Sequence, residues 1–151
     1  MISYAYTAGL FGIDGYEITV ECHSDNKLSS FEIVGLPDNA VKEAKERVRA
    51  AAVNSMLPFP DREILVNLAP ADKPKEGSAF DVAILVSILL NIGAIENPKF
   101  VKDSCFIGEL SLSGDIRRVK GALCMALAAK KAGKKRIFVP KENSREVSVV
   151  S

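Results

Sequence analysis

The sequence lacks tryptophan and has only one histidine and three cysteines among its 151 residues. Cys22, Cys105 and Cys124 are too few and too widely spaced for a disulfide framework or a thiolate metal site, so we expect reduced thiols. His23 cannot supply a site of several imidazoles, and it falls on the polar side of an alternating pattern, where we expect a surface residue rather than a ligand. These shortages predict no metal site and no cofactor within this chain.

Targeting signals and several chemical motifs are also missing. No apolar run reaches the length of a membrane span, and the start, Met1 to Tyr4, lacks the features of a signal peptide. The chain has no G-x-x-x-x-G-K-[ST] loop to cradle phosphates and no G-x-S-x-G nucleophile elbow. Few aromatic residues accompany the basic ones, so no stacking platform for single strands is expected. We predict a cytoplasmic protein without a membrane partner.

The composition suits one globular domain over residues 1–151, with 48% hydrophobic and 26% charged residues. The net charge of +1 hides an asymmetry. Residues 1–113 hold 10 Lys or Arg against 16 Asp or Glu, whereas residues 114–145 hold 10 against two. A basic part on a mildly acidic body indicates either an acidic partner or a solvated face.

The first part of the chain predicts strands joined by tight turns. Residues 2–13 are rich in aromatic and branched side chains, Asp14-Gly15 is a hairpin signal, and residues 16–23 alternate between apolar and polar. With residues 31–34 as a third strand, we expect an antiparallel meander.

A helix is expected from about Asp38, its cap, to Asn54. Its apolar stripe faces the core, and its charged side, which includes Arg47, is interpreted as solvated, with a contact between subunits as the alternative. Residues 64–68 form a nearly continuous apolar run, which predicts a central strand.

Residues 80–92 are apolar on nearly all sides and predict a buried helix. Further patterns predict two short strands, a helix and a final strand at residues 105–107, 110–112, 121–132 and 136–139. A meander followed by alternating helices and strands predicts an α+β fold of two layers, in which helices pack on a mixed sheet.

A polar loop at residues 71–77 joins the central strand to the buried helix. Lys73 and Lys75 lie near Gly77 and Ser78 at the helix start, where free N–H groups favour anions. We therefore treat these four residues as candidate contacts to an anion or to DNA. The alternatives are an ion pair within the loop or a contact between subunits.

The basic part of the chain supplies the other candidates. Their expected role is phosphate contact without sequence readout, and the alternative is docking onto the acidic part of a neighbouring subunit. They are Arg117, Arg118, Lys120, Lys130, Lys131, Lys134, Lys135 and Arg136.

Two stretches resemble the Lon protease domain. The run from Ala69 to Ala79, APADKPKEGSA, is similar to the Lon loop that ends in the catalytic serine. The run from Gly108 to Ile116, GELSLSGDI, with the following KGAL and IFVPKEN, resembles the segment that carries the catalytic lysine. The resemblance implies a Lon-type fold.

The first half resembles a narrower group. FEIVGLPD at residues 31–38 and AVKEAKERVRAA at 40–51 look like the N-terminal domain of the ComM/YifB family of magnesium-chelatase-like AAA+ ATPases. The match covers nearly the whole chain. It implies that an ATPase module, which holds ATP and Mg²⁺, follows Ser151. It also implies a hexameric ring that acts on DNA in branch migration during natural transformation, with other subunits and DNA as partners.

Both Lon catalytic groups are absent at the matching positions. The serine position falls on Ala79 and the lysine position on Leu123, and a Ser-Lys mechanism needs both groups because the amine activates the hydroxyl. Ser78 and Lys120 lie close by in sequence and could form a displaced dyad. Ser78-x-x-Asp81 also has the form of a capping box, which would explain Ser78 structurally.

The resemblance and the missing groups together predict a non-catalytic accessory and assembly domain, not an enzyme in itself. Two alternatives from other classes remain: a Ser-Lys peptidase that uses Ser78 and Lys120, and an oligomerisation module without nucleic-acid contact.

Overall fold

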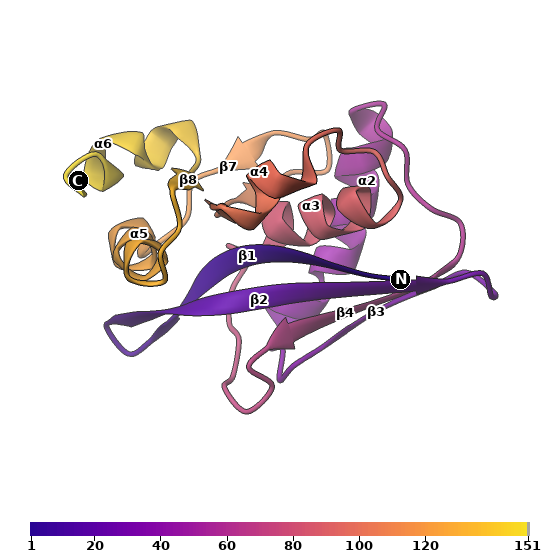
Figure 1. Ribbon diagram of the computed structural model, residues 1–151, viewed down its shortest axis with the longest axis horizontal. Coiled ribbons are helices and arrows are strands. Elements are labelled where there is room, and N and C mark those ends of the chain that lie inside the picture. Colours follow the sequence, from indigo (N-terminus) through magenta and orange to yellow (C-terminus); the bar gives the residue numbers. More distant parts are fainter. Residues whose placement is uncertain (151) are drawn as a thin grey trace.

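The computed structural model describes residues 1–150, and its centre is a four-stranded sheet in the order β1-β2-β4-β3 (Figure 1). The strands are β1 (Ile2–Phe11), β2 (Asp14–Asp25), β3 (Ser30–Val34) and β4 (Glu63–Ala69). β1 and β2 form a long antiparallel hairpin, and its turn contains Gly12 at a φ of 65°. β4 is antiparallel to β2 and parallel to β3, so the sheet is mixed, as the sequence predicts.

The expected antiparallel meander is wrong at its third strand. β3 pairs with β4 and not with β2, because β4 inserts between them. The chain passes from β3 through helices before it returns, and such a crossover brings the next strand back parallel. The central position of β4 is confirmed, and its inward side chains Ile64, Val66 and Leu68 are buried.

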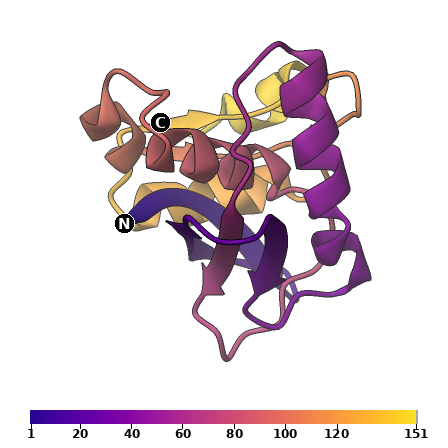
Figure 2. The same ribbon diagram turned by 90° about the vertical axis from the view of Figure 1, so that its right-hand side faces the viewer.

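Helices cover one face of the sheet. α2 (Ala44–Asn54) and α3 (Asp81–Asn91) lie above the strands in Figure 1, and Figure 2 shows the same layers from the side. The single helix expected at residues 38–54 is divided, because α1 (Asn39–Lys42) ends at Glu43. No helix of residues 1–150 is both long and apolar enough to cross a membrane.

α5 (Ala122–Lys131) packs on the β1–β2 hairpin, near its turn. Gly15 permits this approach, because a Cβ there would lie 2.3 Å from the carbonyl oxygen of Cys124. The hairpin and α5 therefore meet backbone to backbone.

The remaining elements are short. β5 (Ser104–Phe106) pairs in parallel with β8 (Arg136–Phe138), and β6 (Glu109–Leu110) pairs with β7 (Ile116–Arg117). Three helices were not expected from the sequence: α4 (Pro98–Lys102), the 3₁₀ helix η1 (Lys141–Asn143) and α6 (Ser144–Val147). They are too short for an apolar period to reveal them.

A buried ion pair joins α2 to α3, which corrects the expectation that Arg47 belongs to a solvated face. The Arg47 guanidinium donates to both carboxylate oxygens of Asp81, at 2.6 and 3.0 Å, and to the carbonyl of Ala40 at 2.8 Å. Asp81 also accepts the backbone N–H of Leu110 at 3.0 Å. The pair and this hydrogen bond therefore connect α2 and α3 to β6.

The three cysteines are free thiols. Burial raises the pKa of Cys22 to about 11 and that of Cys105 to about 12. Both thiols are therefore protonated at neutral pH, and the two residues pack as small apolar side chains in the core.

Candidate functional site

A cavity of about 520 Å³ opens where the loop before α3 meets β6 and the segment before α5. It brings together four of the candidate residues, Gly77, Ser78, Arg118 and Lys120, although two come from the loop and two from the basic part. The full lining is Leu10, Asp38, Glu76, Gly77, Ser78, Ala79, Glu109, Arg118, Val119, Lys120 and Met125.

The wall of this cavity carries both signs of charge. Asp38, Glu76 and Glu109 face the same space as Arg118 and Lys120. A purely basic surface would favour a phosphate chain, whereas this mixture suits a ligand that has both donors and acceptors. The sequence does not reveal the three acidic residues as site members, because they lie far apart in the chain and carry no shared motif.

Lys75 holds the loop beside this cavity in place. Its backbone donates to the carbonyl of Leu36 and accepts the N–H of Asp38, both at 2.9 Å. Its ammonium donates to the carbonyl of Gly35 at 2.7 Å and to the carbonyl of Pro70. The loop is thus attached to the segment that leads into α1.

This position corrects the expectation that Lys75 contacts an anion or DNA. Its side chain is only 1% exposed, and its donors point inward to backbone carbonyls. Burial lowers the pKa of the Lys75 ammonium, and the nearby Asp72 opposes that shift. Lys73 differs, since it is exposed and its ammonium lies 4.6 Å from the ring centroid of Tyr16.

Ser78 does not cap the following helix, so the capping-box interpretation is wrong. Its hydroxyl donates to Glu109, and Asp81, the other half of the expected box, is paired with Arg47. α3 has Phe80 at its cap position and no side-chain cap. Ser78 instead links the loop to β6, inside the cavity.

The serine and lysine positions of the Lon resemblance hold apolar side chains in the structure as well. Ala79 lines the cavity and is buried, and Leu123 lies in the first turn of α5. The displaced pair, Ser78 and Lys120, shares the cavity wall, but the hydrogen bond from Ser78 goes to Glu109. The two positions that match the Lon serine and lysine therefore carry neither a hydroxyl nor an amine.

The other basic candidates form a second region around the C-terminal end of α5 and β8. A smaller cavity of about 220 Å³ lies there, lined on one side by Lys130, Lys134, Lys135 and Arg136. Lys130 and its neighbour Lys131 are exposed in the last turn of α5.

Three members of this region already have partners within the chain. The Lys134 ammonium lies 3.3 Å from the ring centroid of Tyr6 and 3.8 Å from Glu17, and its side chain is 13% exposed. Lys135 pairs with Asp103 at 3.6 Å. The Arg136 guanidinium lies 4.1 Å from the ring centroid of Phe100. Lys130 and Lys131 are exposed and have no such partner among residues 1–150.

Arg117 belongs to neither cavity lining. It lies on β7, is exposed, and pairs with Glu109 at 3.8 Å. Arg117 and Ser78 therefore contact different oxygens of the Glu109 carboxylate, Oε2 and Oε1 respectively.

Comparison with known proteins supports the fold. The chain is 36% identical over 88 residues to a mitochondrial Lon protease homologue of Caenorhabditis elegans, which covers 58% of this chain and 9% of that protein. It is 32% identical over 105 residues to the Lon protease of Methanosarcina barkeri, which covers 69% of this chain and 13% of that protein. These matches and the mixed sheet with its helices confirm the expected Lon-like α+β fold.

Similarity to another group extends over nearly the whole chain. The family model described as subunit ChlI of Mg-chelatase matches residues 20–143. The chain is 39% identical over 150 residues to the competence protein ComM of Haemophilus influenzae and to the uncharacterized protein YifB of Escherichia coli. Each alignment covers 99% of this chain and 29% of the relative, so the chain spans under a third of these proteins. The chain belongs to the ComM/YifB family of Mg-chelatase-like proteins and corresponds to its Lon-like domain.

Proposed function

We propose that this chain is a non-catalytic assembly domain of a ComM/YifB-like AAA+ ATPase that acts on DNA as a ring of subunits. The observation that carries the proposal is that Ala79, in the cavity wall, and Leu123, in α5, occupy the positions that match the reactive groups of Lon. A domain that has a cavity but lacks this chemistry is suited to hold a partner. We propose that a separate module binds ATP and Mg²⁺ and hydrolyses the ATP.

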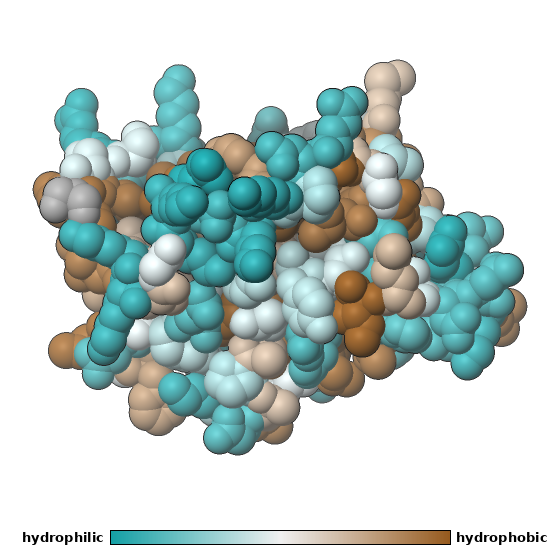
Figure 3. Space-filling model, viewed as in Figure 1, coloured by the Kyte–Doolittle hydropathy of each residue, from teal (hydrophilic) through white to brown (hydrophobic). Residues whose placement is uncertain are grey.

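The surface offers two kinds of contact to such an assembly. The mixed-charge cavity suits a segment of another subunit, because a protein chain supplies both donors and acceptors. The exposed Lys130 and Lys131 suit DNA phosphates, which attract cations without reading sequence. In the view of Figure 3, hydrophilic residues are spread over much of the surface and alternate with hydrophobic ones.

The DNA contact is tested by changing Lys130 and Lys131 to Glu. We expect the wild-type chain to bind duplex DNA weakly at low salt, with an affinity that falls as salt rises, because phosphate contacts release counterions. The double variant should lose about tenfold or more in affinity, because two attractive charges become repulsive. Fluorescence anisotropy with labelled DNA across a salt titration measures both quantities.

A matched control uses Lys42 and Lys99, which are exposed elsewhere and give the same change in net charge when replaced by Glu. If the Lys42→Glu, Lys99→Glu variant loses as much affinity for DNA as the Lys130→Glu, Lys131→Glu variant, the loss reflects general charge repulsion. The proposal that Lys130 and Lys131 contact DNA would then be refuted. If the wild type fails to bind at low salt but self-associates independently of salt, the module serves oligomerisation alone.

One observation favours peptidase activity as a second candidate: Ser78 and Lys120 line the same cavity. A serine-reactive fluorophosphonate probe tests it, with Ser78→Ala as the control. We expect no labelling of Ser78, because its hydroxyl donates to Glu109 and has no lysine acceptor. Labelling that disappears in both Ser78→Ala and Lys120→Met would establish the dyad and overturn the non-catalytic proposal.

A further inference from the structure

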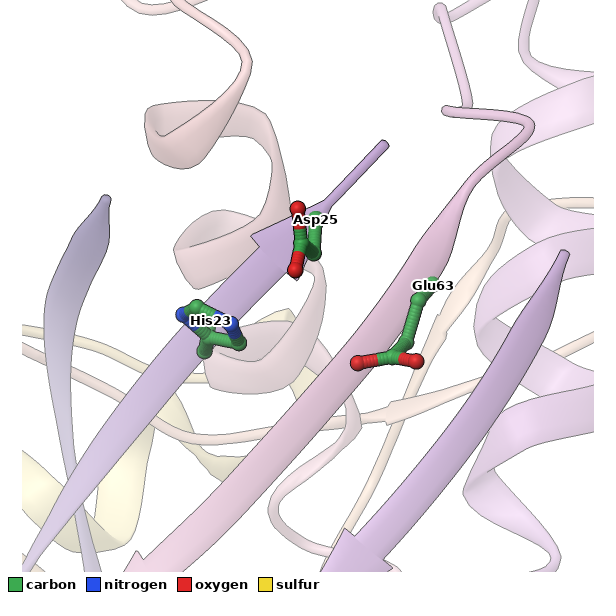
Figure 4. Close-up of side chains that lie close together, drawn as sticks. All are labelled: His23, Asp25 and Glu63. Carbon is green, nitrogen blue, oxygen red and sulfur yellow. The ribbon is translucent and has the colours of Figure 1, made fainter. Parts of the chain in front are cut away.

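Three potential metal ligands meet on the sheet face that is opposite α2 and α3. His23 and Asp25 lie two positions apart on β2, so their side chains share one face, and Asp25 is directly opposite Glu63 of β4. Figure 4 shows the three side chains close together, and one potential ligand atom from each lies within 4.8 Å of the other two. All three are half-buried.

We propose that His23, Asp25 and Glu63 form a binding site for a divalent transition-metal ion, with Zn²⁺ as the best fit. One imidazole and two carboxylates are ligands that Zn²⁺ accepts, and three protein ligands leave a position for water. Mg²⁺ fits less well, because it prefers oxygen ligands in a strict octahedron. The site lies outside both cavities and is independent of the proposed function.

The arrangement of charge favours a cation there. Asp25 and Glu63 are paired across neighbouring strands, and like charges in that position repel each other. Glu21 and Glu32 lie on the same face of the sheet, at alternate positions of β2 and β3. An acidic face of this kind raises the local concentration of cations.

Lys27 is the cation that now neutralises part of this cluster. Its ammonium lies 3.4 Å from Asp25, with 64% of its side chain exposed. The backbone N–H of Asn26 also donates to Asp25 at 2.9 Å and, with Lys27, lowers the pKa of that carboxyl. Because the lysine side chain is largely exposed, it can rotate away from Asp25 to admit a metal ion.

Little movement is needed to close the site. Zn²⁺ binds nitrogen and oxygen at about 2.0–2.2 Å, so its ligand atoms lie roughly 3.3 Å apart in a tetrahedron. Rotation of the partly exposed side chains covers the difference, while the ladder between β2 and β4 keeps the backbone positions fixed. The sequence predicted no metal site because the alternation of β2 does not reveal which residue of β4 lies opposite.

Zn²⁺ binding can be followed directly at His23, because it is the one histidine of the sequence. Zn²⁺ is added to the full chain in a Cys124→Ser background, and the imidazole resonances are followed by NMR. We expect the shifts of the imidazole resonances to saturate at one equivalent of Zn²⁺. His23→Gln and Glu63→Gln should each lower the affinity measured by calorimetry by about tenfold or more.

Two further variants separate a site from diffuse attraction. Glu32→Gln removes an exposed background charge from the same face and should lower the affinity much less than Glu63→Gln, whereas Lys27→Gln should raise it several-fold. If Zn²⁺ leaves the imidazole resonances unmoved, or if Glu32→Gln weakens binding as much as Glu63→Gln, the proposal is overturned.

Discussion

Replacing Arg47 with Met is expected to lower the free energy of unfolding by about 3–5 kcal/mol at neutral pH. The guanidinium supplies two hydrogen bonds to Asp81, whose side chain is 1% exposed. Met fills a similar volume but offers no donor, so the variant keeps an unpaired carboxylate in the core. Urea denaturation measures the loss, provided that the m-value is unchanged.

The deficit of this variant should depend on pH. Burial raises the pKa of Asp81, against hydrogen bonds from Arg47 and Leu110 that lower it. A carboxyl with a raised folded-state pKa gives a contribution that is present below its unfolded pKa and lost as pH rises through the folded one. Without Arg47 that pKa rises further, so the deficit is small in mildly acidic solution and grows toward neutral pH.

Two controls make this result specific to the ion pair. Lys42→Met removes an exposed charge from α1 and should change stability by no more than about 0.5 kcal/mol. Adding Asp81→Leu to Arg47→Met should recover much of the loss, because no buried charge remains. The stabilising role of the ion pair would be contradicted if Arg47→Met lowered the free energy of unfolding equally in mildly acidic and in neutral solution. It would also be contradicted if the Arg47→Met, Asp81→Leu double variant were no more stable than Arg47→Met.

Replacing Gly35 with Ala is expected to destabilise the chain by about 3 kcal/mol or more, through strain and a backbone clash. Gly35 has a φ of 109°, and a Cβ there would lie 2.4 Å from the carbonyl oxygen of Leu68 in β4. Its carbonyl also accepts from Lys75, so any shift reaches the loop beside the candidate site. Thermal unfolding should show a Tm lower by roughly 6 °C or more.

Gly12→Ala is the matched control for backbone strain. Gly12 also has a positive φ, of 65°, but a Cβ there meets no atom within 4 Å. Its cost should therefore stay at about 1–2 kcal/mol, the usual penalty for a left-handed alanine. Equal losses for the two variants would show that the contact with Leu68 contributes nothing.

The elements were easier to predict than their arrangement. Periodicity located β4 and α3 to within a residue or two, because each buries a continuous apolar face. The pairing of β3 was predicted wrongly, since local alternation cannot say that β4 will later occupy the place beside β2. Strand order depends on which edges are left unpaired, and that is a property of the whole sheet.

In the candidate site too, features set by neighbouring residues were predictable from the sequence, whereas contacts between distant residues were not. The resemblance drew attention to the loop around Ser78, and in the structure this loop lines the cavity of about 520 Å³. The roles of Lys75 and Arg47 were misjudged because a charged residue in a sequence looks solvated until its partners are known. Their partners, the carbonyl of Gly35 and the carboxylate of Asp81, lie some 40 and 34 positions away.

The strand order has a consequence for synthesis on the ribosome. The β1–β2 hairpin can form early, yet the inner edge of β2 has no partner until β4 has emerged. Between residues 25 and 69 the ribosome needs roughly 2–9 s at about 5–20 residues per second. During that interval β3 is already available but belongs beside a strand not yet made. Nascent chains are therefore exposed to mispairing at one defined edge, where a chaperone that covers extended strands would have its greatest effect.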